Sequence, residues 1–379
     1  MSSARLRSID FLRGVAALSV VVHHAVSAGG RPPEGTAWFA AVEAVSELGR
    51  MGVPLFFVLS GYCIHARWAQ RKADGQTPDV PFVPFWKRRF FRLYPPYFVA
   101  LVVSMGLVLL EYWKAPGLPL VQAYPEPKLR WMGLDFLAHV TMLHGLHPVF
   151  DRAGGNAPFW TLAREEYFYL LYFPLLAARR KWGLAPTAVA IALLSVSFPF
   201  LLRPWVPPGH AWSGVVVSSA IALWIQWVLG MVAVESAMGL AKWPETFFRP
   251  GIAMLAAASA YAAHLWAEPI APLLWGLFFF AVLGWVVRLE QSKRWPAWRV
   301  VAWFERAGLY SYSIYLVHHP VRGVLKFFLG PLVKSANPLL YAVGIGVIVA
   351  AGYGVGRLFF WFVERHFLSL GKPQTAAPA

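Results

Sequence analysis

The first apolar segment of the chain, SIDFLRGVAALSVVVHH, carries charged and histidine side chains whose spacing suits proton transfer. Arg13 and His24 are eleven residues apart, about three full helical turns, so their side chains point the same way about 16 Å apart. His23 is rotated by about 100° from this line. Asp10 lies three residues before Arg13 on the same face. An imidazole can take a proton from a hydroxyl group near neutral pH. The alternative is that Arg13 only pairs with Asp10 at the membrane boundary.

Three arginines precede another apolar segment, in the run FWKRRFFRLYPPYF. They are Arg88, Arg89 and Arg92. Guanidinium groups match phosphate oxygens in geometry, so this run suits a phosphate clamp. A basic run at such a place is also typical of a topology anchor that contacts anionic lipid. The sequence leaves both functions open.

Charged residues also interrupt the aromatic segment FWTLAREEYFYLLYF, which contains Trp160. Glu165 and Glu166 point about 100° apart on a helix, so one of them at most faces a given site squarely. A carboxylate there could orient a histidine or hold a substrate hydroxyl. The alternative is an ion pair between Arg164 and a glutamate at the headgroup boundary.

The segment GLYSYSIYLVHHPV is rich in hydroxyl groups. Ser311, Tyr315 and His318 recur at helical spacing and form one polar face. Such a face suits a sugar-like or cofactor ligand, although serine and tyrosine also join membrane helices to one another. The candidate substrate-binding residues are Asp10, Trp160, Ser313, Tyr315 and His318.

The sequence argues against two other kinds of site. His139, His144 and His147 do not align on one helix face, and Cys63 is the single cysteine, so we predict no metal site. Ser60 stands in GVPLFFVLSGYCIH without a Gly-x-Ser-x-Gly elbow. We therefore interpret Ser60 and the glycine that follows it as a close helix contact and not as a nucleophile site.

The composition indicates a membrane protein. Of 379 residues, 58% are hydrophobic and only 14% are charged, with a mean hydropathy of +0.52, whereas a soluble domain has roughly a quarter of its residues charged. The net charge of +16 then belongs to cytoplasmic loops, and we expect no nucleic-acid partner. Asp10 and Arg13 interrupt the first apolar stretch, which argues against a cleavable signal peptide.

Ten apolar segments are long enough to cross a bilayer, which predicts an all-α integral membrane protein. They are 9–28, 52–68, 95–112, 159–178, 184–202, 213–235, 250–267, 270–287, 308–330 and 338–362. A weaker segment, 134–150, contains Asp135 and three histidines. We expect one membrane domain over 1–370, followed by a disordered tail over 371–379.

The basic residues predict the orientation of these segments. Arg5 and Arg7 precede the first span, which places the N-terminus in the cytoplasm. If 134–150 is re-entrant or interfacial, the clusters at 179–181 and 288–306 also fall inside. We therefore predict about ten transmembrane helices with both termini cytoplasmic.

Taken together and in this order, the segments resemble the bacterial membrane acyltransferase-3 family, which acylates O-antigen, exopolysaccharides and some macrolides. The segments that carry the resemblance are IDFLRGVAAL with the histidine pair that follows it, GVPLFFVLSGY, RRFFRLYPPY, WTLAREEYFY and YSYSIYLVHHP. They run from about residue 8 to 320. The hydrolase-like domain fused to some relatives is not found in the sequence, so the chain looks like the standalone form.

The resemblance also implies which residues form the site. The family's arginine-and-histidine pair maps onto Arg13 and His24, and its tryptophan-to-glutamate motif maps onto Trp160 and Glu165. Its basic cytoplasmic motif maps onto Arg88, Arg89 and Arg92. The chain departs from the pattern at His23, which the mapping does not exclude, and at Arg164, where an uncharged residue is commoner.

The function implied is transfer of an acyl group, most often acetyl, from cytoplasmic acyl-CoA to a hydroxyl of a carbohydrate or glycan-like acceptor. We expect the protein in the inner membrane of a bacterium, with no permanently bound cofactor. His24 would act as base or carry the acyl group, Glu165 would orient it, and Arg13 would meet the thioester end of the donor. The rival interpretation is a proton-coupled transporter or flippase, because buried charges also occur in carriers.

Overall fold

The computed structural model describes residues 6–27, 30–114, 124–125, 127–266 and 268–368, and within these ranges every regular element is a helix. The longer elements are α1 (Arg7–Ser27), α2 (Phe39–Arg50), α3 (Gly52–Ala73), α4 (Phe82–Lys114), α5 (Lys128–Val140), α6 (Trp160–Trp182), α7 (Leu184–Leu202), α9 (Ala220–Ala237), α10 (Pro250–Trp266), α11 (Ala271–Gln291), α12 (Arg299–Leu309), α13 (Ser311–Val333) and α14 (Pro338–Phe359). The short ones are η1 (His144–Leu146), η2 (Ala157–Phe159), α8 (Ser213–Val217), η3 (Glu245–Phe248), η4 (Phe360–Glu364) and α15 (Arg365–Phe367).

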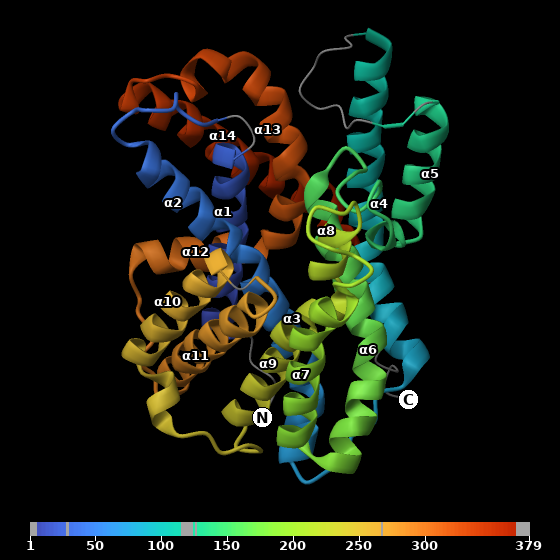
Figure 1. The fold of residues 1–379 in the computed structure, drawn as a ribbon. Coiled ribbons are helices and arrows are strands. Elements are labelled where there is room, and N and C mark those ends of the chain that lie inside the picture. Colours follow the sequence, from blue (N-terminus) through green and yellow to red (C-terminus); the bar gives the residue numbers. More distant parts are fainter. Residues whose placement is uncertain (1–5, 28–29, 115–123, 126, 267, 369–379) are drawn as a thin grey trace, which may run out of the picture.

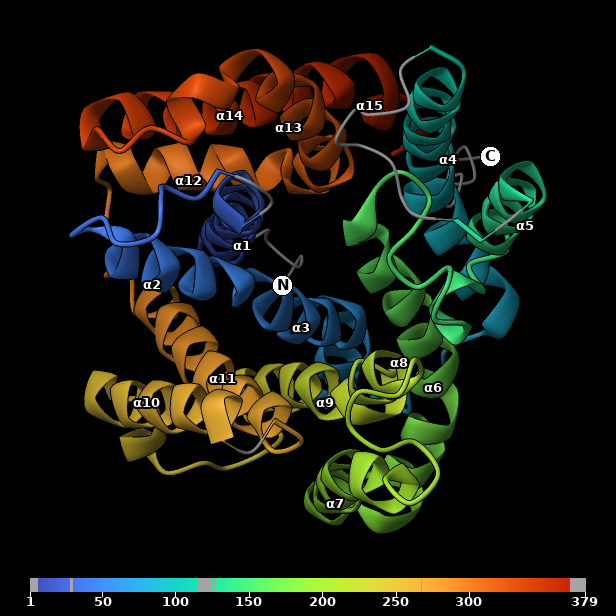
Figure 2. The same cartoon turned by 45° about the horizontal axis from the view of Figure 1, so that its top comes forward.

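Helix α1 lies at the centre of one half of the molecule and packs against α2, α3, α12, α13 and α14 (Figures 1 and 2). Glycines allow this close approach. A Cβ atom at Gly14 would lie 2.0 Å from the carbonyl oxygen of Phe304, and one at Gly308 would lie 1.8 Å from that of Asp10. The backbones of α1 and α12 therefore touch, as small residues permit between membrane helices.

Helices α3 and α9 touch in the same way. A Cβ atom at Gly61 would lie 1.9 Å from the carbonyl oxygen of Trp227, and one at Gly230 would lie 1.9 Å from that of Val58. This contact confirms the interpretation of Ser60 and its neighbour as a close helix contact.

All ten predicted segments fall on helices, and six stretches of the described residues are both long and apolar enough to cross a membrane. They are Arg7–Ser27, Phe82–Trp113, Leu184–Leu202, Ser213–Ala237, Ala271–Gln291 and Pro338–Phe367. Of the other four, α10 has only 17 residues. Helices α3 and α13 contain serine, histidine and charged side chains, and α6 contains charged side chains, all of which lower the hydropathy. Large apolar side chains cover the exterior, including Leu193, Met254 and Leu339, each at least 67% exposed. The chain is thus a helical membrane protein.

The weak segment 134–150 is not one continuous helix. It forms the second half of α5, then a turn, then η1 and a loop. Helix α5 has 13 residues, a length of about 20 Å, which is less than the roughly 30 Å of a hydrocarbon core. The predicted tail at 371–379 and Arg5 lie outside the described residues.

Candidate active site

Helices α1, α4, α6 and α13 carry the predicted site residues, and α3 contributes Cys63, which contacts Arg13. Arg13, on α1, donates a hydrogen bond from Nη2 to Cys63 Sγ at 3.5 Å. The charges of Asp10 and Glu165 act on the same guanidinium group. Arg13 thus interacts with Asp10, as one interpretation required, and also with Glu165 of a distant helix.

The arginines of α4 extend this cluster outward as a series. Arg92 interacts electrostatically with Arg13 and with Arg89, while Arg88 interacts with Arg89 and with Arg67 of α3. The predicted clamp residues therefore follow one another between the surface and Arg13. Arg67 was not among the residues predicted for the clamp.

The groups around Arg13 differ in their exposure. Arg92 is exposed, whereas Arg13 and Tyr312 are half-buried. Within the described residues, Nε of neighbouring Arg89 is buried without a hydrogen-bond partner.

Glu165 is held by two hydroxyl groups, and none of its hydrogen bonds within the described part of the chain goes to a histidine. Ser60 Oγ donates to Glu165 Oε1 at 2.8 Å, and Tyr169 OH donates to the same oxygen. Trp227 Nε1 donates to Ser60 Oγ at 3.2 Å. The expectation that Glu165 orients the His24 ring is therefore not met by the hydrogen bonds of the described residues.

A second carboxylate, Glu364, was missed at the sequence level. It is buried at the end of η4, a π-helical turn, and accepts a hydrogen bond from Ser313 Oγ. Arg92 and Arg13 act electrostatically on it. The available signal was an acidic residue in the apolar run FWFVERHF, and π-helical turns are frequent at functional sites.

The two neighbouring histidines of α1 face different helices. His23 Nδ1 lies 2.8 Å from the carbonyl oxygen of Ser46, on α2. His24 Nδ1 lies 2.9 Å from the carbonyl oxygen of Val20 and 3.3 Å from Nε2 of His318, on α13. A carbonyl oxygen only accepts hydrogen bonds, so this geometry assigns the proton of neutral His24 to Nδ1. Nε2 then carries the lone pair, the form that a general base or a nucleophile needs.

The hydroxyl-rich face of α13 mainly joins helices. Tyr315 OH donates to the carbonyl oxygen of Pro158 at 2.7 Å and also contacts the hydroxyl of Thr161. Trp160 starts α6 beside these residues, and the guanidinium group of Arg152 lies 5.2 Å from its ring centroid. Ser313 and Tyr315 are both buried and engaged in interhelical hydrogen bonds, as the packing interpretation expected.

Arg164 does not pair with a glutamate, which corrects one sequence interpretation. Its Nη2 lies 2.6 Å from Asp151 Oδ1, and it also donates to the carbonyl oxygens of Gly145 and Ser218. Adjacent helix residues point about 100° apart, so Arg164 faces the 141–159 loop while Glu165 faces the interior. Arg164 thereby fixes this loop against α6.

The three histidines near 134–150 do not converge. The rings of His139 and His144 stack in parallel with centroids 3.9 Å apart, whereas His147 packs against Trp212. The nitrogen atoms of the two stacked rings therefore lie in two separate, parallel planes. Among the described residues, no group of three or more potential metal ligands is found.

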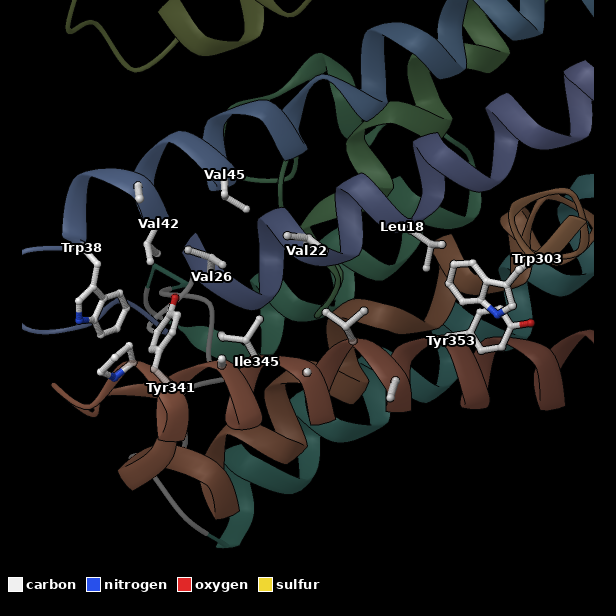
Figure 3. Close-up of a pocket in the computed structure, with 16 residues that line it drawn as sticks. Leu18, Val22, Val26, Trp38, Val42, Val45, Trp303, Tyr341, Ile345 and Tyr353 are labelled. Carbon is white, nitrogen blue, oxygen red and sulfur yellow. The ribbon is translucent and has the colours of Figure 1, made fainter. Parts of the chain in front are cut away.

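A large groove lies on another face of α1, away from these polar groups (Figure 3). It has a volume of about 710 Å³ and is lined almost wholly by apolar atoms of α1, α2, α12 and α14. Val22 and Val26 of α1 face it, and each is two residues from His24, or about 200° around the helix. The groove and the His24 side chain therefore lie on opposite sides of α1.

Comparison with known proteins agrees with this arrangement. The acyltransferase-3 family, described as an acyltransferase domain, matches residues 6–357. The acyltransferase MdmB of Streptomyces mycarofaciens is 27% identical over 254 residues, which are 60% of this chain and 56% of that protein. The peptidoglycan O-acetyltransferase OatA of Listeria monocytogenes is 26% identical over 387 residues, covering 94% of this chain and 55% of that protein.

A protein of Bacillus subtilis named putative peptidoglycan O-acetyltransferase YrhL is also 26% identical and covers 96% of this chain. The chain spans about half the length of these relatives. No solved structure matches the chain significantly. Because the family match extends over nearly the whole sequence, the chain belongs to the acyltransferase-3 family.

Proposed function

We propose that this protein is a membrane O-acyltransferase that moves an acyl group, acetyl in the first instance, from cytoplasmic acyl-CoA to a hydroxyl of a glycan-like acceptor. One observation carries the proposal. Helix α1 carries two key residues of the proposed site. Arg13 lies at the inner end of the arginine series, and His24 contacts α13 and has a lone pair on Nε2. One rigid helix therefore positions both a cationic group that binds the acyl donor and a base.

The arginine series suits the donor. Coenzyme A carries phosphate groups at one end and a thioester at the other, and guanidinium groups bind phosphate oxygens in a bidentate manner. Arg67, Arg88 and Arg89 would hold the phosphates near the surface. Arg92 and Arg13, which interact electrostatically with each other, would meet the pantetheine and thioester end.

The reaction then needs a base for the acceptor. The acceptor hydroxyl gives its proton to His24 Nε2, and its oxygen forms a bond to the thioester carbonyl carbon. The bond between that carbon and sulfur breaks, and the coenzyme A thiolate leaves and takes the proton from His24. The other route, in which His24 Nε2 first accepts the acyl group, balances equally and would leave a transient acyl-imidazole.

The two carboxylates would position Arg13 and not act on the acyl group. Glu165 and Glu364 are both bound by hydroxyl donors and both lie within electrostatic range of Arg13. Fixing a long flexible side chain before the substrate arrives lowers the entropy cost of binding.

We assign the acceptor side to the region around Trp160. Its half-buried ring lies at the start of α6, next to Thr161, which contacts Tyr315 one helical turn from His318. An aromatic ring with a cation nearby suits the face of a sugar. The relatives named for peptidoglycan O-acetylation support a glycan-like acceptor.

We also propose ten membrane crossings with both termini in the cytoplasm of a bacterium. The ten predicted segments all fall on helices, and α5 is too short to cross. With α5 at the interface, the basic clusters at 67–72, 87–92, 179–181 and 288–306 share one side.

The test of the function is acyl transfer in membrane vesicles that expose the cytoplasmic face. Radiolabelled acetyl-CoA is added outside, with peptidoglycan fragments or lipid-linked glycans as acceptor. We expect alkali-labile label on the acceptor. Acceptor that moves across sealed vesicles without gaining label would instead identify a carrier and overturn the proposal.

The proposed donor site can be tested by chemical labelling of a cysteine. Cys63 is the chain's single cysteine and lies beside Arg13. We expect coenzyme A to protect it from a maleimide reagent, because the proposed pantetheine path passes this point. Equal labelling with and without saturating coenzyme A would contradict the assignment of the donor path.

A further inference from the structure

His318 is the partner of His24 across the interface of α1 and α13. Its side chain is buried, with 2% exposure, and the two ring centroids are 5.1 Å apart. Nε2 of His318 lies 3.3 Å from Nδ1 of His24. The two residues are 294 positions apart in the chain, so the pair exists only in the folded protein.

The hydrogen bonds of His318 assign its proton. Its Nδ1 lies 2.8 Å from the carbonyl oxygen of Tyr315 and 3.2 Å from that of Ile314. Both are acceptors only, so neutral His318 carries its proton on Nδ1 and a lone pair on Nε2. That lone pair faces the Nδ1–H of His24, which is shared between His318 and Val20.

We propose that His318 is a positioning residue for His24, an inference that rests on the proposed function. By accepting from Nδ1–H it keeps the His24 proton on that nitrogen, so that Nε2 stays free for the acceptor hydroxyl. It also fixes the plane of the ring and stabilises the imidazolium form while His24 holds the acceptor's proton. This is the part that the third member of a catalytic triad plays, here taken by a second imidazole.

The neighbouring histidine provides a matched control. His319 lies one residue further along α13, and its Nε2 is 3.2 Å from Nη2 of Arg322. An arginine is always a donor, so this nitrogen of His319 is an acceptor engaged with Arg322 and not with His24. If any histidine near the site were sufficient for the role, replacing His319 would lower activity as much as replacing His318. A positioning role predicts that only replacement of His318 lowers activity.

The test compares side chains of similar length at position 318. Gln can accept from His24 Nδ1–H through its amide oxygen, and Met cannot. In the full-length protein we expect His318→Met to lower kcat about 10²-fold, the scale of a group that acts through a general base. The KM for acetyl-CoA should stay unchanged. His318→Gln should recover to within about tenfold of wild type, and His319→Gln should match wild type.

Three outcomes would overturn the inference: equal kcat for His318→Met and His318→Gln, a loss confined to KM, or an equal loss in His319→Gln. If His318→Met does not yield folded protein in detergent, the test uses His318→Gln instead. The kcat of His318→Gln must then be lower than that of His319→Gln, with an equal KM for acetyl-CoA. The His24→Ala variant distinguishes a failure of the role proposed for His24 from a failure of the role inferred for His318. Acyl transfer that survives in His24→Ala refutes the proposed role of His24, on which the inference rests, whereas an inactive His24→Ala beside a fully active His318→Met refutes only the role of His318.

Discussion

Two histidines enclosed by the protein, His65 and His24, lie in very different surroundings. His65 is fully buried, and both of its ring nitrogens are engaged, Nδ1 with Tyr172 OH and Nε2 with Glu235, each at 2.9 Å. Arg179 in turn donates to both oxygens of Glu235. The half-buried His24 has its hydrogen bonds on one nitrogen, Nδ1.

The difference indicates a structural role for His65 and a chemical role for His24. A polar network in which every group is satisfied makes a rigid, unreactive support between α3, α6 and α9. A ring that is held firmly by one nitrogen while the other keeps its lone pair is oriented and still reactive. Both sites contain a histidine inside the membrane domain, so the presence of ionisable groups alone does not identify the active centre.

The largest effect on stability should come from the satisfied network. Glu235→Leu leaves Arg179 and His65 without their buried partner, and breaking such a pair costs about 3–5 kcal/mol. We expect a large loss of thermal stability in detergent, measured by the temperature at which the protein aggregates. Glu47→Leu, which removes an exposed pair with Arg50, is the control and should change stability by less than about 1 kcal/mol. Equal behaviour of the two variants would contradict the comparison.

The next effect concerns donor binding. Arg92→Gln removes one charged donor from the proposed donor path, which we expect to raise the KM for acetyl-CoA about tenfold, the equivalent of one charge-assisted hydrogen bond. Stability should not change. Lys87→Gln alters an exposed cation on the same helix and is the matched control. An unchanged KM in Arg92→Gln would remove this residue from the donor path.

The smallest effect is expected at Tyr315, which tests packing against substrate binding. Tyr315→Phe loses the hydrogen bonds to Pro158 and Thr161 and should cost about 1 kcal/mol of stability. The kcat and the KM for the acceptor should change less than about threefold, which steady-state kinetics would show. A selective rise of the acceptor KM would instead place Tyr315 in the acceptor site.

Much of the fold could be predicted because lipid as a solvent demands long apolar runs. In its described residues, each of the ten segments lies mainly on one helix or on two consecutive helices, and the helical phase of α1 correctly separated His23, which faces α2, from His24, which faces α13. The hydropathy of α3, α6 and α13 is low for spans because these helices contribute polar residues to the site.

Other features of the site could not be predicted, because they depend on tertiary contacts that no local sequence pattern encodes. His318 was expected to bind substrate, yet its ring contacts His24 from another helix. Glu364 lay beyond the predicted end of the last span, and a π-helical turn places it in the interior. One of the two interpretations paired Arg164 with a glutamate, but its partner, Asp151, lies in a loop whose path the sequence did not predict.

The central claim is that the Nε2 atom of His24 performs acyl transfer. The most direct measurement is the rate of label transfer from acetyl-CoA to acceptor by His24→Ala and His23→Ala at equal amounts of folded protein. We expect His24→Ala to lose about 10³-fold, the contribution of a general base, and His23→Ala to stay near wild type because its Nδ1 contacts Ser46 on α2. Transfer by His24→Ala at the wild-type rate, or an equal loss in both variants, would contradict the account.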